Sequence, residues 1–332
     1  MDLPAFRMNL HMGTSQNDSH IQSSTESSTE LTWLQKPQSR DDGSGVAPLS
    51  GSASRRKATR KTATNGLSGR QYQILLILNS YGWCTPEMVG RIAVIHGMAG
   101  RATWIYTLLH DLRALGYVAT MRNMNGTNGL VYAVSEFGLA YIRARRDDLV
   151  CDTNVLKNPG SMNHVLAVNQ IMLRFRSEFR PRFWLTDFQV RADNMQLGTD
   201  GLAKDYDSAG ELSLPDRSIQ IGIEFESQQK TAAQYAKLCA CFAAEKYLHL
   251  VIYFLGSPDL LSSIAPHLRS LGGLVCFVNY RDFITDGSAA SAFYWYDDEV
   301  LTANLRDVMT HVSQRNTPVY LPQNQLELRL SA

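Results

Sequence analysis

The sequence has few cysteines and no long apolar run. Its five cysteines are odd in number and none forms a CxxC pair, so neither a disulfide framework nor a zinc site is indicated. After residue 68, no stretch without Asp, Glu, Lys or Arg is longer than 71–86, which contains polar residues and falls short of the roughly 18 apolar residues of a membrane span. No apolar segment follows a basic N-terminus, as it would in a secretory signal. We therefore expect a cytoplasmic protein without a membrane span.

An excess of one charge is also lacking. The 332 residues include 32 basic and 31 acidic side chains, which excludes a protein that coats nucleic acid with its whole surface. The charge is unevenly distributed, however. Residues 69–146 contain eight basic and three acidic residues, a net charge of +5, whereas residues 161–285 contain twelve basic and thirteen acidic ones. The excess positive charge therefore belongs to the segment 69–146.

Residues 1–68 are rich in serine, threonine and glycine and show no apolar periodicity. This composition predicts a disordered tail. Its distal end, residues 55–61, is a basic cluster. The cluster is either a solvated linker or an arm that neutralises DNA phosphates.

The segment 69–146 has the pattern of three helices followed by a β-hairpin. Helices are expected at residues 71–81, 85–97 and about 101–115. The last has apolar residues three or four apart, at Ile105, Leu108, Leu112 and Leu115. Two apolar strands then flank the turn residues 125–129, whose Asn-Gly pairs favour a hairpin. A further short helix follows. Three helices and a hairpin predict a winged helix-turn-helix domain, in which the third helix enters the DNA major groove and the hairpin lies along the backbone.

Several polar side chains of this domain are candidates for DNA binding. They lie on the face of the third helix away from its leucines and on the hairpin: Arg101, Thr103, Tyr106, Arg122, Asn125 and Asn128. The net charge of +5 favours DNA as the ligand. The alternative is a small domain that dimerises or docks another protein.

After a predicted linker at residues 147–160, the segment 161–285 alternates helices and strands. Strands are expected at 183–190, 218–226, 248–254 and 274–278, with helices at 163–179, 231–246 and 259–271. A polar loop of about two dozen residues separates the first two strands. The pattern predicts a mixed α/β sheet with helices on its faces. Residues 286–332 form an extension with one aromatic strand.

Acidic residues stand at the end of one buried strand of this sheet. Glu224 and Glu226 lie two residues apart and therefore project on the same face. Two such carboxylates repel unless a cation or basic groups separate them, and Mg²⁺ and Mn²⁺ prefer oxygen ligands. Asp216 would join them if a turn near Arg217 folded the chain back. The alternative is a strand end that enters solvent with ordinary charges.

The order of these motifs resembles the replication-relaxation family of plasmid proteins. After the winged helix come the helix start Ser161-Met162-Asn163-His164, then Pro215-Asp216, Glu224-Phe225-Glu226 and Gln234-Tyr235-Ala236-Lys237. The resemblance covers about residues 69 to 270. The family overlaps the C-type mobilisation relaxases, whose catalytic domain is similar to PD-(D/E)xK restriction endonucleases. Here Glu-x-Glu stands where those nucleases carry (D/E)xK.

The resemblance implies a restriction-endonuclease-like sheet and a divalent metal site. Asp216, Glu224 and Glu226 would bind Mg²⁺ or Mn²⁺, which would polarise a scissile phosphate. His164 would be an acid/base group or a buried structural histidine. Lys230 would supply the positive charge that Glu-x-Glu lacks, or would be an ordinary solvent-exposed lysine. The missing lysine leaves both altered and lost chemistry open.

A relaxase that links covalently to DNA needs a tyrosine nucleophile, for which Tyr206 and Tyr235 are candidates by position. No P-loop occurs, so ATP-driven unwinding is not indicated. We expect a relaxase that nicks double-stranded DNA at a plasmid or conjugative-element origin, with accessory mobilisation proteins as further partners. The alternatives are a non-catalytic replication factor that keeps a nuclease-like scaffold and a winged-helix regulator with a ligand-binding domain.

Overall fold

The computed structural model describes residues 66–98, 102–122, 129–145, 161–296, 299–315, 317–320 and 322. Residues 1–65 of the predicted tail (1–68) and the predicted linker at 147–160 lie outside them. Among the described residues, no helix has both the length and the apolarity to cross a membrane.

The first described elements form the predicted winged helix. Their bounds are α1 (Gly69–Tyr81), α2 (Pro86–Ile95), α3 (Ala102–Ala114), β1 (Val118–Arg122), β2 (Leu130–Val134) and α4 (Glu136–Arg143). Local signals set the helix starts: Ser68 and Gln71 form a capping box at α1, and Thr85 accepts a hydrogen bond from the N–H of Met88 at α2. The hairpin β1–β2 is antiparallel. The winged-helix prediction is confirmed.

The apolar face of α3 differs slightly from the predicted one. Ile105 and Leu112 are buried as expected, but Leu109 is fully buried and Leu115 is 44% exposed. Leu115 lies beyond the last residue of α3, where the chain turns at Gly116 with a positive φ of 83°. The helical spacing therefore ends one residue before Leu115.

The second part of the chain forms a seven-stranded mixed sheet. Its strands, in spatial as well as chain order, are β3 (Pro181–Thr186), β4 (Ser208–Ser213), β5 (Ser218–Glu226), β6 (Leu250–Leu255), β7 (Val275–Asn279), β8 (Ser291–Tyr296) and β9 (Glu299–Asn304). The three central strands β5, β6 and β7 are parallel, and the remaining pairs are antiparallel. The predicted mixed α/β class is confirmed, and β8 and β9, from the predicted extension, complete the sheet.

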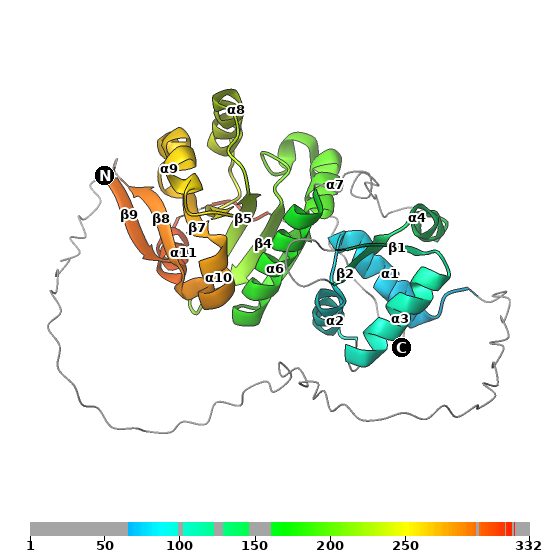
Figure 1. Cartoon of the computed structure of the whole chain (residues 1–332). Helices are drawn as coiled ribbons and strands as arrows, with labels where there is room; N and C mark the ends of the chain where they lie inside the picture. The colour runs from blue at the N-terminus through cyan, green and yellow to red at the C-terminus, as the bar shows by residue number, and fades with distance from the viewer. Residues whose placement is uncertain are drawn as a thin grey trace, which may run out of the picture. The chain divides into compact units, whose positions relative to one another are not determined.

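Helices cover both faces of this sheet (Figure 1). Side chains of α6 (Met162–Glu178), α10 (Tyr280–Asp286) and α11 (Leu305–Val312) share one core with the sheet. Side chains of α7 (Asp187–Leu197), α8 (Ala232–Ala243), α9 (Leu260–Ile264) and η3 (Ala265–Leu274) share the other. Two short 3-10 turns, η2 (Gly198–Asp200) and η4 (Gly287–Ala289), complete the fold. Successive residues of β6 enter alternate cores, as strand geometry requires.

The first strand and the following loop were predicted incorrectly. The strand expected over 183–190 ends at Thr186, and α7 begins at Asp187. Thr186 and Gln189 form a capping box, with the Thr186 N–H donating to Gln189 Oε1 at 2.9 Å. The capping signal Thr-x-x-Gln thus starts a helix inside the segment 183–190, which its apolar residues had predicted to be a single strand. The expected polar loop contains most of α7 and the strand β4 as well.

Candidate active site

Acidic side chains from two neighbouring strands meet at one edge of the sheet. The antiparallel strands β4 and β5 pair Ser208 with Ile223. Asp207, directly before β4, therefore lies beside Glu224 near the end of β5. Glu226 follows on the same face as Glu224. Both glutamates are only 7% exposed, so this is not a strand end that enters solvent.

A histidine from α6 joins this edge. His164 lies in the first turn of α6, and its Nε2 atom is 2.9 Å from Asp207 Oδ1. Asp207 Oδ2 accepts a 2.8 Å hydrogen bond from the backbone N–H of Phe225. The His164 ring also packs edge-on against Phe225, with 5.5 Å between the ring centroids. Asp207 therefore connects α6 with the middle of the Glu-x-Glu segment.

Two lysines contact the two glutamates. Lys204, from the loop before β4, forms an ion pair with Glu224. Lys230 forms an ion pair with Glu226, four residues earlier in the chain. The positive charge that the Glu-x-Glu segment lacks in sequence is thus present in space. Paired charges of this kind make the burial of two carboxylates tolerable.

The ionisable groups of the cluster shift one another's pKa. Burial raises the pKa of Glu224 to about 7; Lys204 opposes this rise and Asp207 adds to it. Burial also acts to raise the pKa of Asp207, but the bond to His164 and the Phe225 N–H hold it below its usual range. Burial alone would lower the pKa of His164, yet the contact with Asp207 raises it.

The raised pKa of Glu224 makes a prediction for stability in the absence of metal. Because folded Glu224 holds its proton up to about pH 7, its contribution is full below pH 4.5, the ordinary pKa of a glutamate, and is lost as the pH rises through about 7. As the pH rises from about 4.5 to about 7, the free energy of unfolding of the wild type should fall relative to that of Glu224→Gln. The fall should be a few kcal/mol at most, since a shift of one pKa unit is worth about 1.4 kcal/mol. Urea unfolding of both proteins in the presence of chelator, at several pH values in this range, measures the difference. The same pH dependence in both proteins would contradict the raised pKa of Glu224.

The loop before β4 is held by two side chains outside the acidic edge. Glu245 Oε2 accepts hydrogen bonds from the N–H of Ala203 at 3.1 Å and from the hydroxyl of Tyr206 at 2.9 Å. Asn194, on α7, donates to the carbonyl oxygen of Lys204 at 3.0 Å. These contacts fix the backbone that presents Lys204 and Asp207 to the cluster.

Asp216 does not join this cluster. The sequence prediction requires a turn near Arg217 that folds the chain back, but β5 is continuous over Ser218–Glu226. Asp216 is exposed in the turn between β4 and β5, at the opposite end of the sheet. At about 3.3 Å per strand residue, β5 separates it from Glu224 by about 20 Å. Asp207 takes the position beside Glu224 that the prediction gives to Asp216.

Neither tyrosine candidate presents an accessible hydroxyl. Tyr206 and Tyr235 are both fully buried. The Tyr206 hydroxyl donates to Glu245, and burial together with that carboxylate raises its pKa well above the usual value. The Tyr235 hydroxyl accepts a 3.1 Å hydrogen bond from the N–H of Lys230. Both hydroxyls serve the packing of the site in this structure.

The DNA-binding candidates are only partly described. Three of them lie outside the described residues: Arg101, Asn125 and Asn128. Thr103 belongs to α3, where Tyr106 is 57% exposed, and Arg122 is exposed at the end of β1. His110 and Arg113 are exposed on α3 as well, at helical spacing from Tyr106. The described part of the domain thus presents aromatic and basic side chains on the surface of its third helix.

Sequence reasoning missed Lys204 and Asp207. Both lie in the segment interpreted as a polar loop, because β4 consists largely of small residues such as Ser208 and Gly210. The available signal was the pair Asp205 and Asp207 directly before a short segment that contains Ala209 and Leu212. That signal is weak without knowledge of the partner strand.

The cluster contains oxygen ligands for a divalent ion but no closed cage. Among the described residues, no group of three or more histidine, cysteine, aspartate or glutamate side chains is arranged to hold a metal. Asp207 and Glu224 are the two adjacent carboxylates. Tyr253 lies opposite Glu224 on β6, and its buried hydroxyl has no hydrogen-bond partner among the residues that the structure describes. A polar group is thus left unsatisfied next to the carboxylates.

Comparisons with known proteins give one match. A family model described as replication-relaxation matches residues 87–225, less than half of the chain. The matched region runs from the second helix of the winged helix to Phe225 and includes His164, Lys204, Asp207 and Glu224. No curated protein and no solved structure matches the chain.

Proposed function

We propose that this protein nicks one strand of double-stranded DNA at an origin of transfer or replication of a plasmid or conjugative element. The observation that carries the proposal is the buried edge where Asp207 faces Glu224, with His164 bound to Asp207. The replication-relaxation match associates the same region with plasmid replication or mobilisation. A PD-(D/E)xK-like catalytic domain and accessory mobilisation partners belong to this proposal.

The proposed cofactor is Mg²⁺ or Mn²⁺, and the residues present fit it. Mg²⁺ is usually held by one or two carboxylates, with waters and substrate phosphates completing its shell, so a closed cage is not required. Asp207 and Glu224 would supply the two carboxylates. The unpartnered Tyr253 hydroxyl, whose pKa is raised by burial and by the charges of Glu224 and Asp207, would find a partner in the ion's water shell. When bound, the ion would stabilise charge on the scissile phosphate.

The remaining side chains of the cluster have separate roles in this proposal. Lys204 and Lys230 place positive charge beside the carboxylates, where a phosphodiester would approach. His164 is fixed through Nε2 by Asp207, so Nδ1 is the nitrogen that exchanges a proton with the reacting groups. The raised pKa of His164 keeps the ring protonated to higher pH and thus able to donate a proton to the leaving oxygen.

The winged helix would bind the origin sequence through α3 and the β1–β2 hairpin. Replacing Arg122 by alanine should weaken DNA binding and lower the slope of log affinity against log salt by about one, because one phosphate contact is lost. Fluorescence anisotropy on a labelled duplex at several salt concentrations measures this slope. The control is Arg281→Ala, an exposed arginine of α10. Equal slopes for both variants would count against the hairpin as a DNA contact.

One observation favours a second candidate function, a non-catalytic DNA-binding replication or regulatory factor. Lys204 and Lys230 already pair with both glutamates, which is also how a nuclease-like site would be stabilised after its activity was lost. In that case DNA binding would persist without cleavage.

The test of the proposed function uses a duplex that the protein itself selects from a random-sequence library. Each strand is end-labelled in turn and incubated with the protein and Mg²⁺ or Mn²⁺, or with chelator. Cleavage of one strand in the metal samples supports the proposal. Tight binding without cleavage in any metal would favour the non-catalytic alternative.

A further inference from the structure

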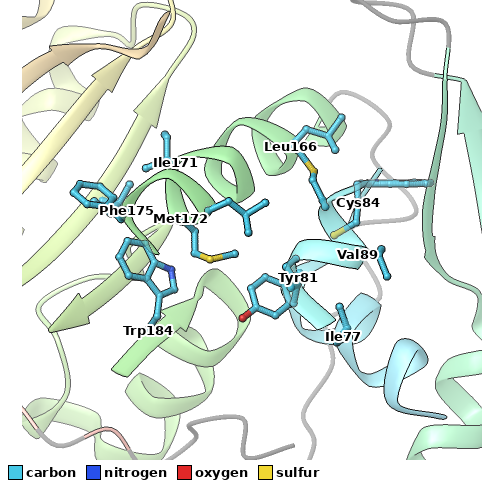
Figure 2. Close-up of a cluster of buried hydrophobic side chains, with 14 of the residues drawn as sticks. Ile77, Tyr81, Cys84, Val89, Leu166, Ile171, Met172, Phe175 and Trp184 are labelled. Carbon is cyan, nitrogen blue, oxygen red and sulfur yellow. The ribbon is translucent and has the colours of Figure 1, made fainter. Parts of the chain in front are cut away.

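Helix α6 packs against the winged helix as well as against the sheet. One continuous apolar core contains side chains of α1, α2 and α6 and of the sheet strands. Figure 2 shows this junction, which gathers Ile77, Tyr81, Val89, Leu166, Met172 and Trp184. The helix that begins at the candidate active site is therefore also the helix on which the DNA-binding domain rests.

A buried asparagine of α6 holds the winged helix at this junction. Asn169 is 4% exposed, and its Nδ2 donates to the carbonyl oxygens of Tyr81 at 2.9 Å and Trp83 at 3.0 Å. Tyr81 is the last residue of α1, where carbonyl groups have no partner within the helix. Both side-chain hydrogens of Asn169 are thus used to bind backbone of the other domain.

The segment that Asn169 holds is connected in turn to the hairpin. Cys84, in the turn after α1, exchanges two backbone hydrogen bonds of 3.0 and 2.8 Å with Tyr132 of β2. A second polar contact between the two parts joins Arg91, on α2, to the carbonyl oxygen of Leu173 at 3.4 Å. The turn after α1, the hairpin and α2 are therefore all fixed relative to α6.

The same helix positions the catalytic histidine of the proposed function. His164 precedes Asn169 by five residues, about 7.5 Å along the axis at 1.5 Å per residue. A regular α-helix transmits position over this distance without a flexible element. The contacts of Asn169 on one side and of His164 with Asp207 on the other therefore belong to one rigid segment.

We propose that Asn169 is a positioning residue that sets the distance along the DNA between the sequence that the winged helix binds and the phosphodiester that is cleaved. The inference rests on the proposed function, since it assigns a cleavage position. A freely tethered DNA-binding domain would allow cleavage at several positions. A domain held by two directed hydrogen bonds and a shared core restricts the site to one.

The first test maps the cut at nucleotide resolution on the selected duplex for the wild type, Asn169→Leu and Asn163→Leu. Asn163 is an exposed asparagine of the same helix and serves as the control. We expect one cleavage position for the wild type and the control, and several neighbouring positions for Asn169→Leu with unchanged DNA affinity. A single unchanged position for Asn169→Leu would overturn the proposal.

The second test is independent of cleavage. Spin labels are attached at His110→Cys on α3 and Glu299→Cys on β9, both exposed positions, and their distance distribution is measured by pulsed electron paramagnetic resonance. To prevent labelling at native cysteines, every labelled protein has serine in place of Cys151, Cys239 and Cys241. We expect one narrow distribution, and a broader one when Asn169→Leu is added. A broad distribution without that substitution would overturn the proposal.

The two tests separate the two proposals. A protein that gives a narrow distance distribution but cleaves no DNA would refute the nicking activity and leave the rigid connection in place. If Asn169→Leu does not fold, Arg91→Ala removes the other polar contact at the surface of the junction. That variant should then broaden the distance distribution, and an unchanged one would count against the inference.

Discussion

Replacing Asp207 by asparagine should reduce DNA nicking by at least about a hundredfold, because even the outer partners of metal ligands contribute about ten- to a hundredfold. The substitution removes one of the two carboxylates proposed to hold the ion and weakens the anchor of His164. DNA affinity should not change, since the proposal assigns DNA binding to the winged helix and not to the acidic edge. Conversion of supercoiled to open-circular plasmid and anisotropy on a duplex measure the two properties separately.

Asp216→Asn is the matched control for this prediction. It makes the same chemical change at an exposed turn at the opposite end of β5. Nicking by this variant should equal that of the wild type. If Asp216→Asn abolished nicking and Asp207→Asn did not, the ligand set derived from the strand pairing would be wrong.

The affinity for Mg²⁺ should fall about tenfold for each pH unit below about 7, because the ion must displace the proton of Glu224. The pKa of Glu224 is raised to about 7 by burial, which sets the upper end of this range. His164, Asp207, Lys204 and Lys230 also face this carboxylate. Protonation of His164 at lower pH should also lower the affinity for Mg²⁺. Titration calorimetry between about pH 5 and pH 8 measures both the affinity and the proton release.

Glu224→Gln separates the two contributions to this pH dependence. The variant should bind Mg²⁺ weakly, with a pH dependence that reflects His164 alone. His164→Gln should keep the part that belongs to Glu224. A wild-type affinity that does not change between about pH 5 and pH 8 would mean that Glu224 is not a ligand.

The parts of the fold that the sequence predicted correctly have strong local signals. The apolar spacing of the helices and the Asn-Gly pairs between the two apolar strands are signals that act within a few residues, so three helices and a hairpin were recognisable. The strand β5 was recognisable because its three isoleucines, at positions 219, 221 and 223, alternate with Gln220 and Gly222. The placement of Glu224 and Glu226 together followed from its two-residue period.

The parts that were missed depend on pairing between distant segments. The position of Asp207 beside Glu224 follows from the register of β4 against β5, which no local pattern specifies. Asp216 is closer to Glu224 along the chain than Asp207 is, yet the continuous strand β5 carries it to the other end of the sheet. Lys204 is placed by Asn194 and Glu245, two contacts that form only in the folded protein.

One measurement tests the central claim most directly. Supercoiled plasmid that carries the selected binding sequence is incubated with wild-type protein and Mg²⁺, with wild-type protein and chelator, and with Asp207→Asn and Mg²⁺. Open circles in the first sample alone are the predicted result. Intact supercoils in all three samples despite a clear gel shift, or open circles with Asp207→Asn, would contradict a metal-dependent nicking site at Asp207 and Glu224.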